Sequence, residues 1–400
     1  MIPWRLDPLD PLIFGNGKPA TNGAAIESLP LPWPTTVAGA FRTRVGSPHG
    51  YWNGTSPATA KAWSILGPLL TRQEKNGTWK LLVPAPADAV LLEPKHDEAV
   101  GSPPSSIQRW SDAQRRRLQV LQPPPGVESS APPVGLSPFD PSKPYGGAPA
   151  QWTWEELEAW LAEGGESVTS KEGKDHLPQA AGNELPAVVR RVHVGIDPDT
   201  QRAADGLLFT TEARDFSAKK LKGEAAGGGA WSTPLSFVLW ATEKLSPGIG
   251  QLGGERRMVR WEQDGPSLPG RSPELHQKLL LSAKQKGFLR VHLLTPAYFP
   301  SGSTWTPPEG VELIAQISGR PHPVSGWDLE KRGPKKMRRL VPAGSVYFVK
   351  ITKKDVAEEW IRDWWFQSIC TTDQEKNDGL GLAVVGCWDG PVDFELGKKK

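Results

Sequence analysis

The stretch from Asp378 to Trp388, near the C-terminus, constrains the fold of this 400-residue chain more than any other. Its two glycines, Gly379 and Gly381, lead directly into an apolar run that includes β-branched residues. Glycine adopts positive φ without strain and lets another backbone come close. The pattern therefore predicts a glycine turn before a buried strand, and a phosphate lying against the loop is the alternative interpretation. A dinucleotide fingerprint is not matched, because there the glycines follow a strand and open a helix.

Composition limits the class of protein and its partners. Proline and glycine, with 41 and 42 residues, make up about a fifth of the chain, which predicts many turns and long loops. The formal net charge of +3 does not by itself indicate a nucleic-acid partner. Two cysteines, Cys370 and Cys387, are too few for a disulfide framework or a cysteine zinc site, and they fit a reducing, cytoplasmic location. No signal peptide and no apolar run of about 18 residues is visible, so no membrane partner is expected.

The first third of the chain alternates strand and helix patterns. Residues 3–9 read as a strand, and Pro34 helps to start a helix over 35–45. A second short helix is predicted at 61–70, and strands at 79–83 and 89–92 are predicted to form a hairpin. This order is the opening of a ferredoxin-like, or RRM-like, unit.

The remainder repeats the mixed pattern after a long interruption. Residues around 122–186 are predicted to be an irregular insertion that carries one helix at 152–162, started by a capping box of Thr153 and Glu156. Further elements are predicted as strands at 188–194, 207–211 and 235–242, a helix at 273–287, strands at 288–294, 311–318 and 345–351, a helix at 357–369 and a strand at 382–388.

The predicted fold class is α+β, with two ferredoxin-like (RRM-like) domains and long irregular insertions. The N-terminal domain is expected at 1–215 and contains the insertion around 122–186. The C-terminal domain is expected at 216–400 and carries the glycine-rich loop near 378–382.

The order of short motifs along the chain resembles a known family. The N-terminal strand, the loop 15–19, the helix start at Pro34 and the C-terminal glycine loop together resemble RAMP-superfamily proteins, which are the RNA-binding subunits of CRISPR effector complexes. Within that superfamily the chain looks most like subunit three of the type III-B (Cmr) complex. The resemblance covers most of the chain except 122–186, and further motifs that carry it are 191–197, 206–211, 252–256, 295–299, 326–328 and 338–344.

The resemblance implies a non-catalytic RNA-binding subunit without a cofactor. Such a subunit grips the 5′ repeat-derived tag of the CRISPR RNA and docks on the large polymerase-like subunit and on a backbone RAMP subunit. Target RNA is then met only indirectly, through pairing with the guide. The superfamily also uses a protruding hairpin to split guide–target pairing, and either 195–206 or 214–230 could supply it.

Clustered basic residues and glycines are the candidate RNA contacts. The segment 331–339 holds six basic residues in nine and no acid, and Gly333 with Pro334 argues against a helix there. It is either a solvated loop or a loop that follows phosphates. The three arginines at 256, 257 and 260 either contact RNA or pair with Glu255 and Glu262. The full candidate set is Gly39, Arg42, Arg44, Arg190, Arg191, His193, Arg256, Arg257, Arg260, Lys335, Lys336, Arg338, Arg339, Gly379 and Gly381.

Catalytic patterns are weak, so no enzyme activity is expected. The seven histidines form no metal-binding or acid–base motif, and no P-loop or nucleophile elbow is present in the sequence. Two alternatives stay open. The first is a RAMP endoribonuclease that uses His49 or His193 to process CRISPR RNA, and the second is a purely structural assembly subunit.

Overall fold

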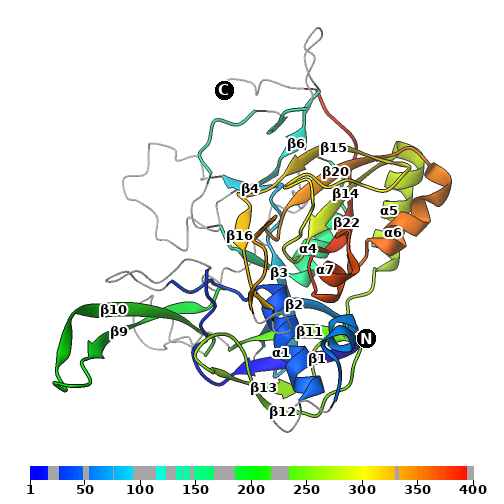
Figure 1. The fold of residues 1–400 in the computed structure, drawn as a ribbon. Helices are drawn as coiled ribbons and strands as arrows, with labels where there is room; N and C mark the ends of the chain where they lie inside the picture. The colour runs from blue at the N-terminus through cyan, green and yellow to red at the C-terminus, as the bar shows by residue number, and fades with distance from the viewer. Residues whose placement is uncertain are drawn as a thin grey trace.

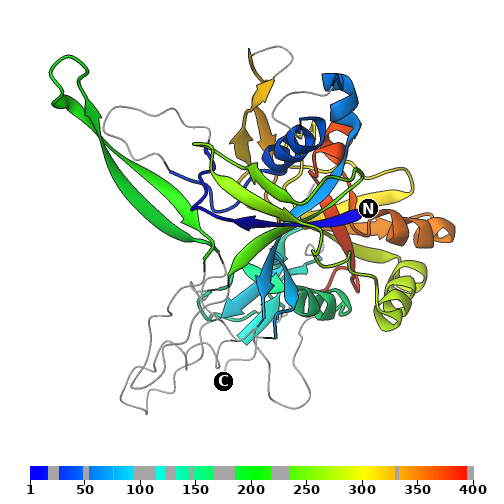
Figure 2. The same cartoon turned by 90° about the horizontal axis from the view of Figure 1, so that it is seen from below.

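The computed structural model describes residues 1–16, 27–47, 54–74, 76–92, 114–122, 132–137, 139–144, 148–165, 185–217, 234–328 and 333–393. The fold is a mixed α/β arrangement of mostly antiparallel sheets with few helices (Figure 1), which agrees with the α+β prediction. Two large sheets dominate, and a long hairpin projects from one side of the molecule (Figure 2).

The N-terminal sheet has seven strands in the order β12-β13-β1-β11-β2-β3-β8. Each pair of neighbours is antiparallel. The helix α1 (Pro34–Gly46) packs on one face of this sheet through Val37, Ala38 and Phe41. The strands are β1 (Ile2–Pro8), β2 (Ile65–Gln73), β3 (Trp79–Pro84), β8 (Gln151–Thr153), β11 (Leu235–Ala241), β12 (Gly248–Gln251) and β13 (Met258–Glu262).

The C-terminal sheet has five strands in the order β15-β20-β14-β22-β21. Its strands are β14 (Phe288–Leu293), β15 (Val311–Ile317), β20 (Val346–Ile351), β21 (Gln367–Ser368) and β22 (Leu382–Cys387). The accompanying helices are α4 (Trp154–Leu161), α5 (Pro273–Leu281), which continues as the π-helical turn η1 (Ser282–Lys286), the 3-10 turn η2 (Lys354–Val356), α6 (Ala357–Asp363) and α7 (Asp373–Asn377).

Strand β11 explains how the two halves join. Phe237 and Leu239 face the core beneath α1, whereas Val238 and Trp240 belong to the core shared with the C-terminal sheet. Side chains alternate between the faces of a strand, so an entirely apolar strand must be covered on both sides. The N-terminal sheet is therefore a middle layer, with α1 on one face and the C-terminal half on the other.

Several two-stranded sheets accompany the two large sheets. The projecting hairpin consists of β9 (Ala187–Ile196) and β10 (Ala203–Asp215). The other pairs are β4 (Ala89–Leu92) with β5 (Gln114–Arg117), β6 (Gln119–Val120) with β7 (Val134–Gly135), β16 (His322–Val324) with β19 (Arg338–Leu340), and β17 (Trp327–Asp328) with β18 (Gly333–Pro334). The short helix α2 spans Pro57–Ala62.

Most predicted elements are confirmed with small shifts at their ends. The capping box at the start of α4 is present, because Thr153 and Glu156 each accept from the other's backbone N–H. The helix predicted at 273–287 is formed by α5 and η1, and it ends where Gly287 adopts φ 80°. The segment around 333–340 is extended, as its glycine and proline predict.

The helix predicted at 61–70 is wrong, because α2 ends at Ala62 and β2 begins at Ile65. Pro68 lies near the end of that stretch, where it would remove a helical hydrogen bond and clash with the preceding turn. The apolar residues around it instead form a buried strand that pairs with β11 and β3.

Two further predictions need correction. The strands at 79–83 and 89–92 do not pair with each other, since β3 pairs with β2 and β8 while β4 pairs with β5. The helix predicted at 357–369 ends at Asp363, because the chain turns at Phe366 and β21 joins the edge of the C-terminal sheet.

The predicted division at 215/216 does not coincide with the boundary between the sheets. Strands β11, β12 and β13 all follow residue 215 and yet belong to the N-terminal sheet. The insertion around 122–186 also contributes β8 and α4, so it is partly regular. In addition, no helix joins β11 to β13 and none joins β14 to β15, although both connections are described throughout.

Candidate nucleic-acid interface

A basic cleft brings together residues that lie far apart in the sequence. Its volume is about 220 Å³, and it lies between the start of α1 and the strands β16 and β19. Its lining residues are Thr35, Thr36, Gly39, Val324, Ser325, Gly326, Lys335, Lys336 and Arg338. Four predicted RNA-contact residues therefore meet at one cavity, which we call the basic cleft.

The start of α1 presents the positive end of the helix to this cleft. Pro34 fixes the first helical position, and the preceding Trp33 is extended with φ −63° and ψ 142°. No side chain caps the helix and its first turn contains no acid, so the positive end of the helix dipole is not neutralised locally. Gly39 is exposed, and a Cβ built there would meet no atom within 4 Å, so the surface beside the helix start stays open.

The opposite wall of the basic cleft supplies the cations. The backbone of Lys335 is held by an N–H bond to the Gly326 carbonyl (2.7 Å) and by the Ser325 hydroxyl, which donates to the Lys335 carbonyl (2.8 Å). The side chains of Lys335 and Lys336 are exposed, and neither pairs with an acid among the residues that the structure describes. Both ammonium groups can therefore reach a phosphate.

Arg338 and Arg339 differ in environment although they are neighbours. Arg338 is held in place by Glu375 at 2.7 Å, and its guanidinium lies 5.4 Å from the centre of the Tyr298 ring. Arg339 is exposed and sits opposite Pro323 in the pairing of β19 with β16, and it does not line the basic cleft. Lys331 and Arg332, the first two bases of the cluster, lie outside the described residues.

The glycine loop is buried and approaches protein atoms. Gly379 has φ 79° and Gly381 has φ 69°, which L side chains rarely adopt. A Cβ on Gly379 would lie 2.2 Å from the Gly67 carbonyl oxygen, and one on Gly381 would lie 2.5 Å from the Cys370 sulfur. The close approach predicted for these glycines is thus made by the chain itself, and their contact with RNA stays a prediction.

Arg42 connects α1 to the glycine loop. Its guanidinium lies 2.5 Å from the Asp378 carboxylate, and both side chains are almost fully buried. It also donates to the backbone carbonyls of Lys61, Trp63 and Asn377. These hydrogen bonds use the donors of Arg42 for protein acceptors, and its contact with RNA stays a prediction.

The other predicted arginines surround β12 and β13. Arg44 donates to the Ser246 carbonyl (3.1 Å), and Arg256 lies in a turn with φ 53°. Arg257 pairs with Glu255 at 2.8 Å and Arg260 with Glu262 at 4.0 Å. These pairs match the alternative in which the arginines balance neighbouring acids.

The projecting hairpin carries the remaining candidates. Arg190 is 71% exposed and pairs with Glu212 at 3.0 Å, and Arg191 is exposed. The ring of His193 stacks on Phe209 at 5.1 Å, and its Nε2 lies 2.8 Å from the Thr211 hydroxyl. Neither partner is a carboxylate or a base, so the contacts of His193 do not create an acid–base pair.

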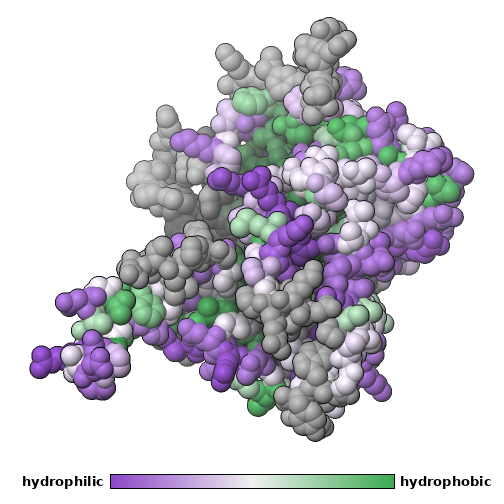
Figure 3. Space-filling view, viewed as in Figure 1, coloured by the Kyte–Doolittle hydropathy of each residue, from purple (hydrophilic) through white to green (hydrophobic). Residues whose placement is uncertain are grey.

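The hairpin is unusually apolar for an exposed element. Figure 3 shows hydrophobic side chains on the hairpin next to hydrophilic ones. The exposed apolar residues are Val188, Val192, Val194, Ile196, Leu207 and Leu208. A narrow ribbon of two strands cannot bury both of its faces, which explains this exposure.

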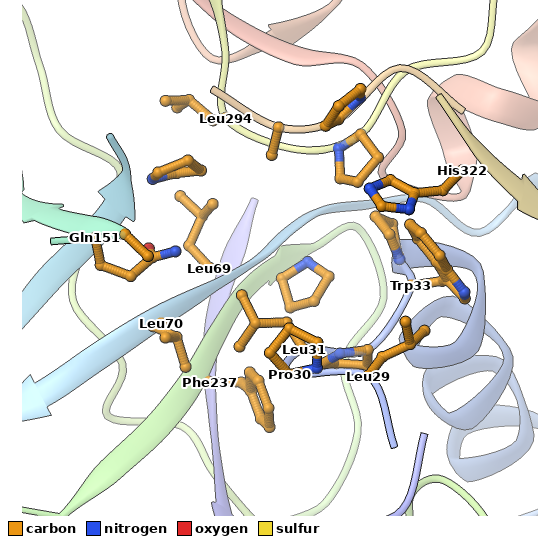
Figure 4. Close-up of a pocket in the computed structure, with 18 of the residues that line it drawn as sticks. Leu29, Pro30, Leu31, Trp33, Leu69, Leu70, Gln151, Phe237, Leu294 and His322 are labelled. Carbon is orange, nitrogen blue, oxygen red and sulfur yellow. The ribbon is translucent and has the colours of Figure 1, made fainter. Parts of the chain in front are cut away.

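A second cavity, of about 260 Å³, was not foreseen from the sequence (Figure 4). It lies between the two large sheets, behind the start of α1, and we call it the apolar pocket. Its walls come from Leu29–Pro34, Pro68–Leu70, Pro84, Ala85, Ala150, Gln151, Phe237, Leu294, Pro296, His322, Pro342 and Ala343. The proline-rich run before α1 is the only sequence signal near it.

Metal and membrane features can be assessed for the described ranges. Within them, no group of three or more His, Cys, Asp or Glu side chains is arranged to hold a metal ion. No helix there has the length and apolarity that crossing a membrane requires.

The fold and the basic cleft define a candidate nucleic-acid-binding protein built on two β-sheets. The profile of the family described as "CRISPR-associated protein (Cas_Cmr3)" matches residues 4–388, so the chain belongs to this family. The resemblance to subunit three of the type III-B complex is thereby confirmed.

Solved structures include chains that are similar to this one. One is a chain of "Cryo-EM structure of the Type III-B Cmr-beta bound to cognate target RNA and AMPPnP, state 1", with a TM-score of 0.44, 14% identity and 86% of each chain covered. Another is from "Cryo-EM structure of the Type III-B Cmr-beta bound to cognate target RNA", with a TM-score of 0.45, 14% identity and coverage of 90% of this chain and 89% of that one. A search of curated proteins finds no match.

Proposed function

We propose that this chain is a non-catalytic RNA-binding subunit of a type III-B CRISPR effector complex. In this role it grips the 5′ repeat-derived tag of the CRISPR RNA and docks the large polymerase-like subunit and a backbone RAMP subunit. Family membership supports the complex, and the basic cleft is the observation that supports RNA binding.

The cleft combines two ways of holding a phosphate. The uncapped, positive end of α1 suits an anion, and Lys335 and Lys336 supply mobile charge opposite. Single-stranded RNA is commonly held by such a positively charged groove that follows its backbone. Because phosphate contacts carry no sequence information, pairing with the guide reads the target.

We infer further that both halves derive from ferredoxin-like units. When the main strands of each half are numbered in chain order, both sheets follow the order 4-1-3-2, as β13-β1-β11-β2 and as β22-β14-β20-β15. Each half lacks one connecting helix of such a unit. The shared order supports the ferredoxin-like assignment despite the missing helices.

The hairpin of β9 and β10 is our candidate for the protruding element that splits guide–target pairing. Residues 195–206 form its tip, and it stands clear of the rest of the molecule (Figures 1 and 2). Most of the alternative segment, 214–230, lies outside the described residues.

Charge reversal at the cleft tests the proposed function. We expect Lys335→Glu with Lys336→Glu to weaken binding of single-stranded repeat RNA. The slope of log affinity against log salt should also become shallower, by about 0.7 for each phosphate that the variant no longer binds. Fluorescence anisotropy of the labelled RNA at several salt concentrations gives both quantities.

The matched control is Lys244→Glu with Lys278→Glu, which makes the same charge change at exposed lysines outside the cleft. If the cleft variant and the control give equal affinities and slopes, the basic cleft does not bind phosphate. Metal-independent cleavage of repeat RNA by the isolated chain, abolished in His193→Ala, would instead favour the endoribonuclease alternative.

A further inference from the structure

The apolar pocket contains one buried polar side chain without a partner. Gln151, in the edge strand β8, is only 6% exposed, and its amide points into the pocket (Figure 4). That amide makes no hydrogen bond to any of the residues that the structure describes. The amide atoms face the open space of the pocket, so this position is suited to a ligand that presents a donor beside an acceptor.

Flat, apolar surfaces surround this amide. Prolines and leucines form most of the walls, and Phe237 lies at the inner side. Trp33 and His322 form a pair at the mouth, with ring centres 5.8 Å apart and planes tilted by 54°. His322 is exposed, so the pair is open to solvent on one side. Such walls favour a planar, weakly polar group, which gains from contact with aromatic faces.

The apolar pocket and the basic cleft share their boundary. Pro34 lines the pocket and Thr35, the next residue of α1, lines the cleft. On the other side, His322 lines the pocket and Val324, two residues along β16, lines the cleft. In an RNA held by a phosphate at the start of α1, the base of the same nucleotide or of an adjacent one would therefore lie within reach of the pocket.

We propose that the apolar pocket receives one unstacked nucleobase of the RNA whose phosphates lie in the basic cleft, and that Gln151 hydrogen-bonds the edge of this base. The proposal rests on the RNA-binding function proposed above. A volume of about 260 Å³ is below the roughly 300–1,000 Å³ of sites for drug-sized ligands, which fits a single planar ring system. An apolar side chain from a protein partner would leave the Gln151 amide unpaired.

The base in the pocket would not be available for pairing with a target. Single-stranded RNA is recognised in this way, because an unstacked base exposes its Watson–Crick and Hoogsteen edges to side chains. A glutamine amide pairs with a base through two hydrogen bonds, and this gives the pocket the ability to select a base as well as to hold it.

A scan of abasic RNAs with the full-length chain tests the proposal. Each nucleotide of the repeat-derived tag is replaced in turn by an abasic site, and binding is measured by fluorescence anisotropy at one salt concentration. We expect one position at which removal of the base weakens binding by about tenfold or more, since a good bidentate contact contributes roughly 1–3 kcal/mol.

Two variants connect that position to the pocket. Gln151→Leu keeps the size and removes the hydrogen bonds, and His322→Ala shortens the exposed rim. We expect each to weaken binding of intact RNA without changing the salt slope, and to reduce the penalty of the abasic site at that one position. Gln285→Leu, an exposed glutamine on η1, is the matched control, and thermal melting verifies that each variant is folded.

The outcomes separate this proposal from the proposed function. If the wild-type chain binds RNA but the abasic scan is flat, or the variants leave the abasic penalty unchanged, the pocket does not hold a base and the basic cleft still binds phosphate. If the wild-type chain binds no RNA, both are wrong. If both variants bind RNA normally but lose the other subunits on copurification, the pocket receives a protein segment.

Discussion

At the scale of single residues, one carboxylate buried among arginines should tolerate substitution poorly. Asp88 is fully buried and pairs with Arg290, lies 3.7 Å from the Arg117 guanidinium and accepts from the Trp160 ring N–H at 3.0 Å. Burial alone would raise the pKa of Asp88, but the positive charges of Arg290 and Arg117 lower it below its ordinary value. This cluster joins the β4–β5 pair to the C-terminal sheet.

Removing the Asp88 charge should be strongly destabilising. Asp88→Asn would leave two buried guanidinium groups without their counter-ion, and breaking a buried pair in this way costs about 3–5 kcal/mol. Urea denaturation followed by tryptophan fluorescence measures the free energy of unfolding. Asp205→Asn, at the exposed hairpin tip, is the control and should change it by less than about 0.5 kcal/mol. A similar small effect for Asp88→Asn would show that the cluster is unimportant for stability.

His292 makes stability depend on pH. Burial lowers the pKa of His292 from 6.5 to about 3. Below pH 6.5 the His292 imidazole is therefore protonated in the unfolded chain, whereas in the folded chain it stays neutral down to about pH 3. Stability is fully present above pH 6.5 and falls by up to about 1.4 kcal/mol per pH unit as the pH decreases through this window. His292→Leu should flatten the dependence of unfolding free energy on pH between 6.5 and 4.5, and an unchanged slope would contradict this account.

The glycines Gly381 and Gly39 should respond in opposite ways to alanine. Gly381→Ala places a Cβ 2.5 Å from the Cys370 sulfur at φ 69°, so we expect a destabilisation of about 1–3 kcal/mol. Gly39→Ala adds a Cβ in open space within a helix, so we expect a stabilisation of about 0.5–1 kcal/mol. Thermal melts of both variants test this. Equal effects would mean that the backbone at 381 relaxes.

At the scale of elements, exposure separates two kinds of apolar strand. Val238 of β11 is completely buried, whereas Val192 of β9 is 68% exposed and Leu208 of β10 is 61% exposed. The first contributes to folding, and the others are available to partners. Exposed apolar patches on this scale usually mark interaction surfaces.

Serine substitutions should distinguish these two kinds of strand. Val192→Ser with Leu208→Ser should change the free energy of unfolding by less than about 0.5 kcal/mol, since these side chains are mostly in solvent. Val238→Ser should cost more than about 2 kcal/mol, because it removes apolar burial and places a hydroxyl in the core. Denaturant titration measures both. A large destabilisation of the hairpin variant would mean that the hairpin packs on the body.

At the scale of the whole molecule, the largest core extends across both sheets. It contains Leu69 and Trp240 from the N-terminal sheet together with Val291 and Val349 from the C-terminal sheet. The Arg42–Asp378 pair adds a buried electrostatic connection between α1 and the glycine loop. The two halves are therefore expected to depend on each other for stability.

This shared core predicts a single cooperative unfolding transition. Calorimetry of the full chain should show one peak, because unfolding one half would expose the apolar face of the other. Fragments 1–262 and 263–400, cut between the sheets, should each aggregate when expressed alone. Two separate transitions would show that the halves fold independently.

The sequence by itself determined the class and the local structure. Apolar runs and glycine turns predicted β11, β14, β20 and β22, and the Thr153–Glu156 spacing predicted the cap of α4. These signals are local, because propensities, caps and strand periodicity depend on residues within a few positions. The order of short motifs likewise sufficed to identify the family.

The tertiary structure alone decided which distant residues meet. Local apolarity could not reveal that 65–70 is a strand within the sheet, because a short apolar run is compatible with both a buried helix and a buried strand. Only pairing with the neighbouring strands decides between them. By its residue type alone Arg42 would be a surface cation, but sheet packing places Asp378 against it. Gln151 would be a polar loop residue, but the two sheets enclose it. Long-range pairing depends on strand order, and no local pattern in the chain encodes that order.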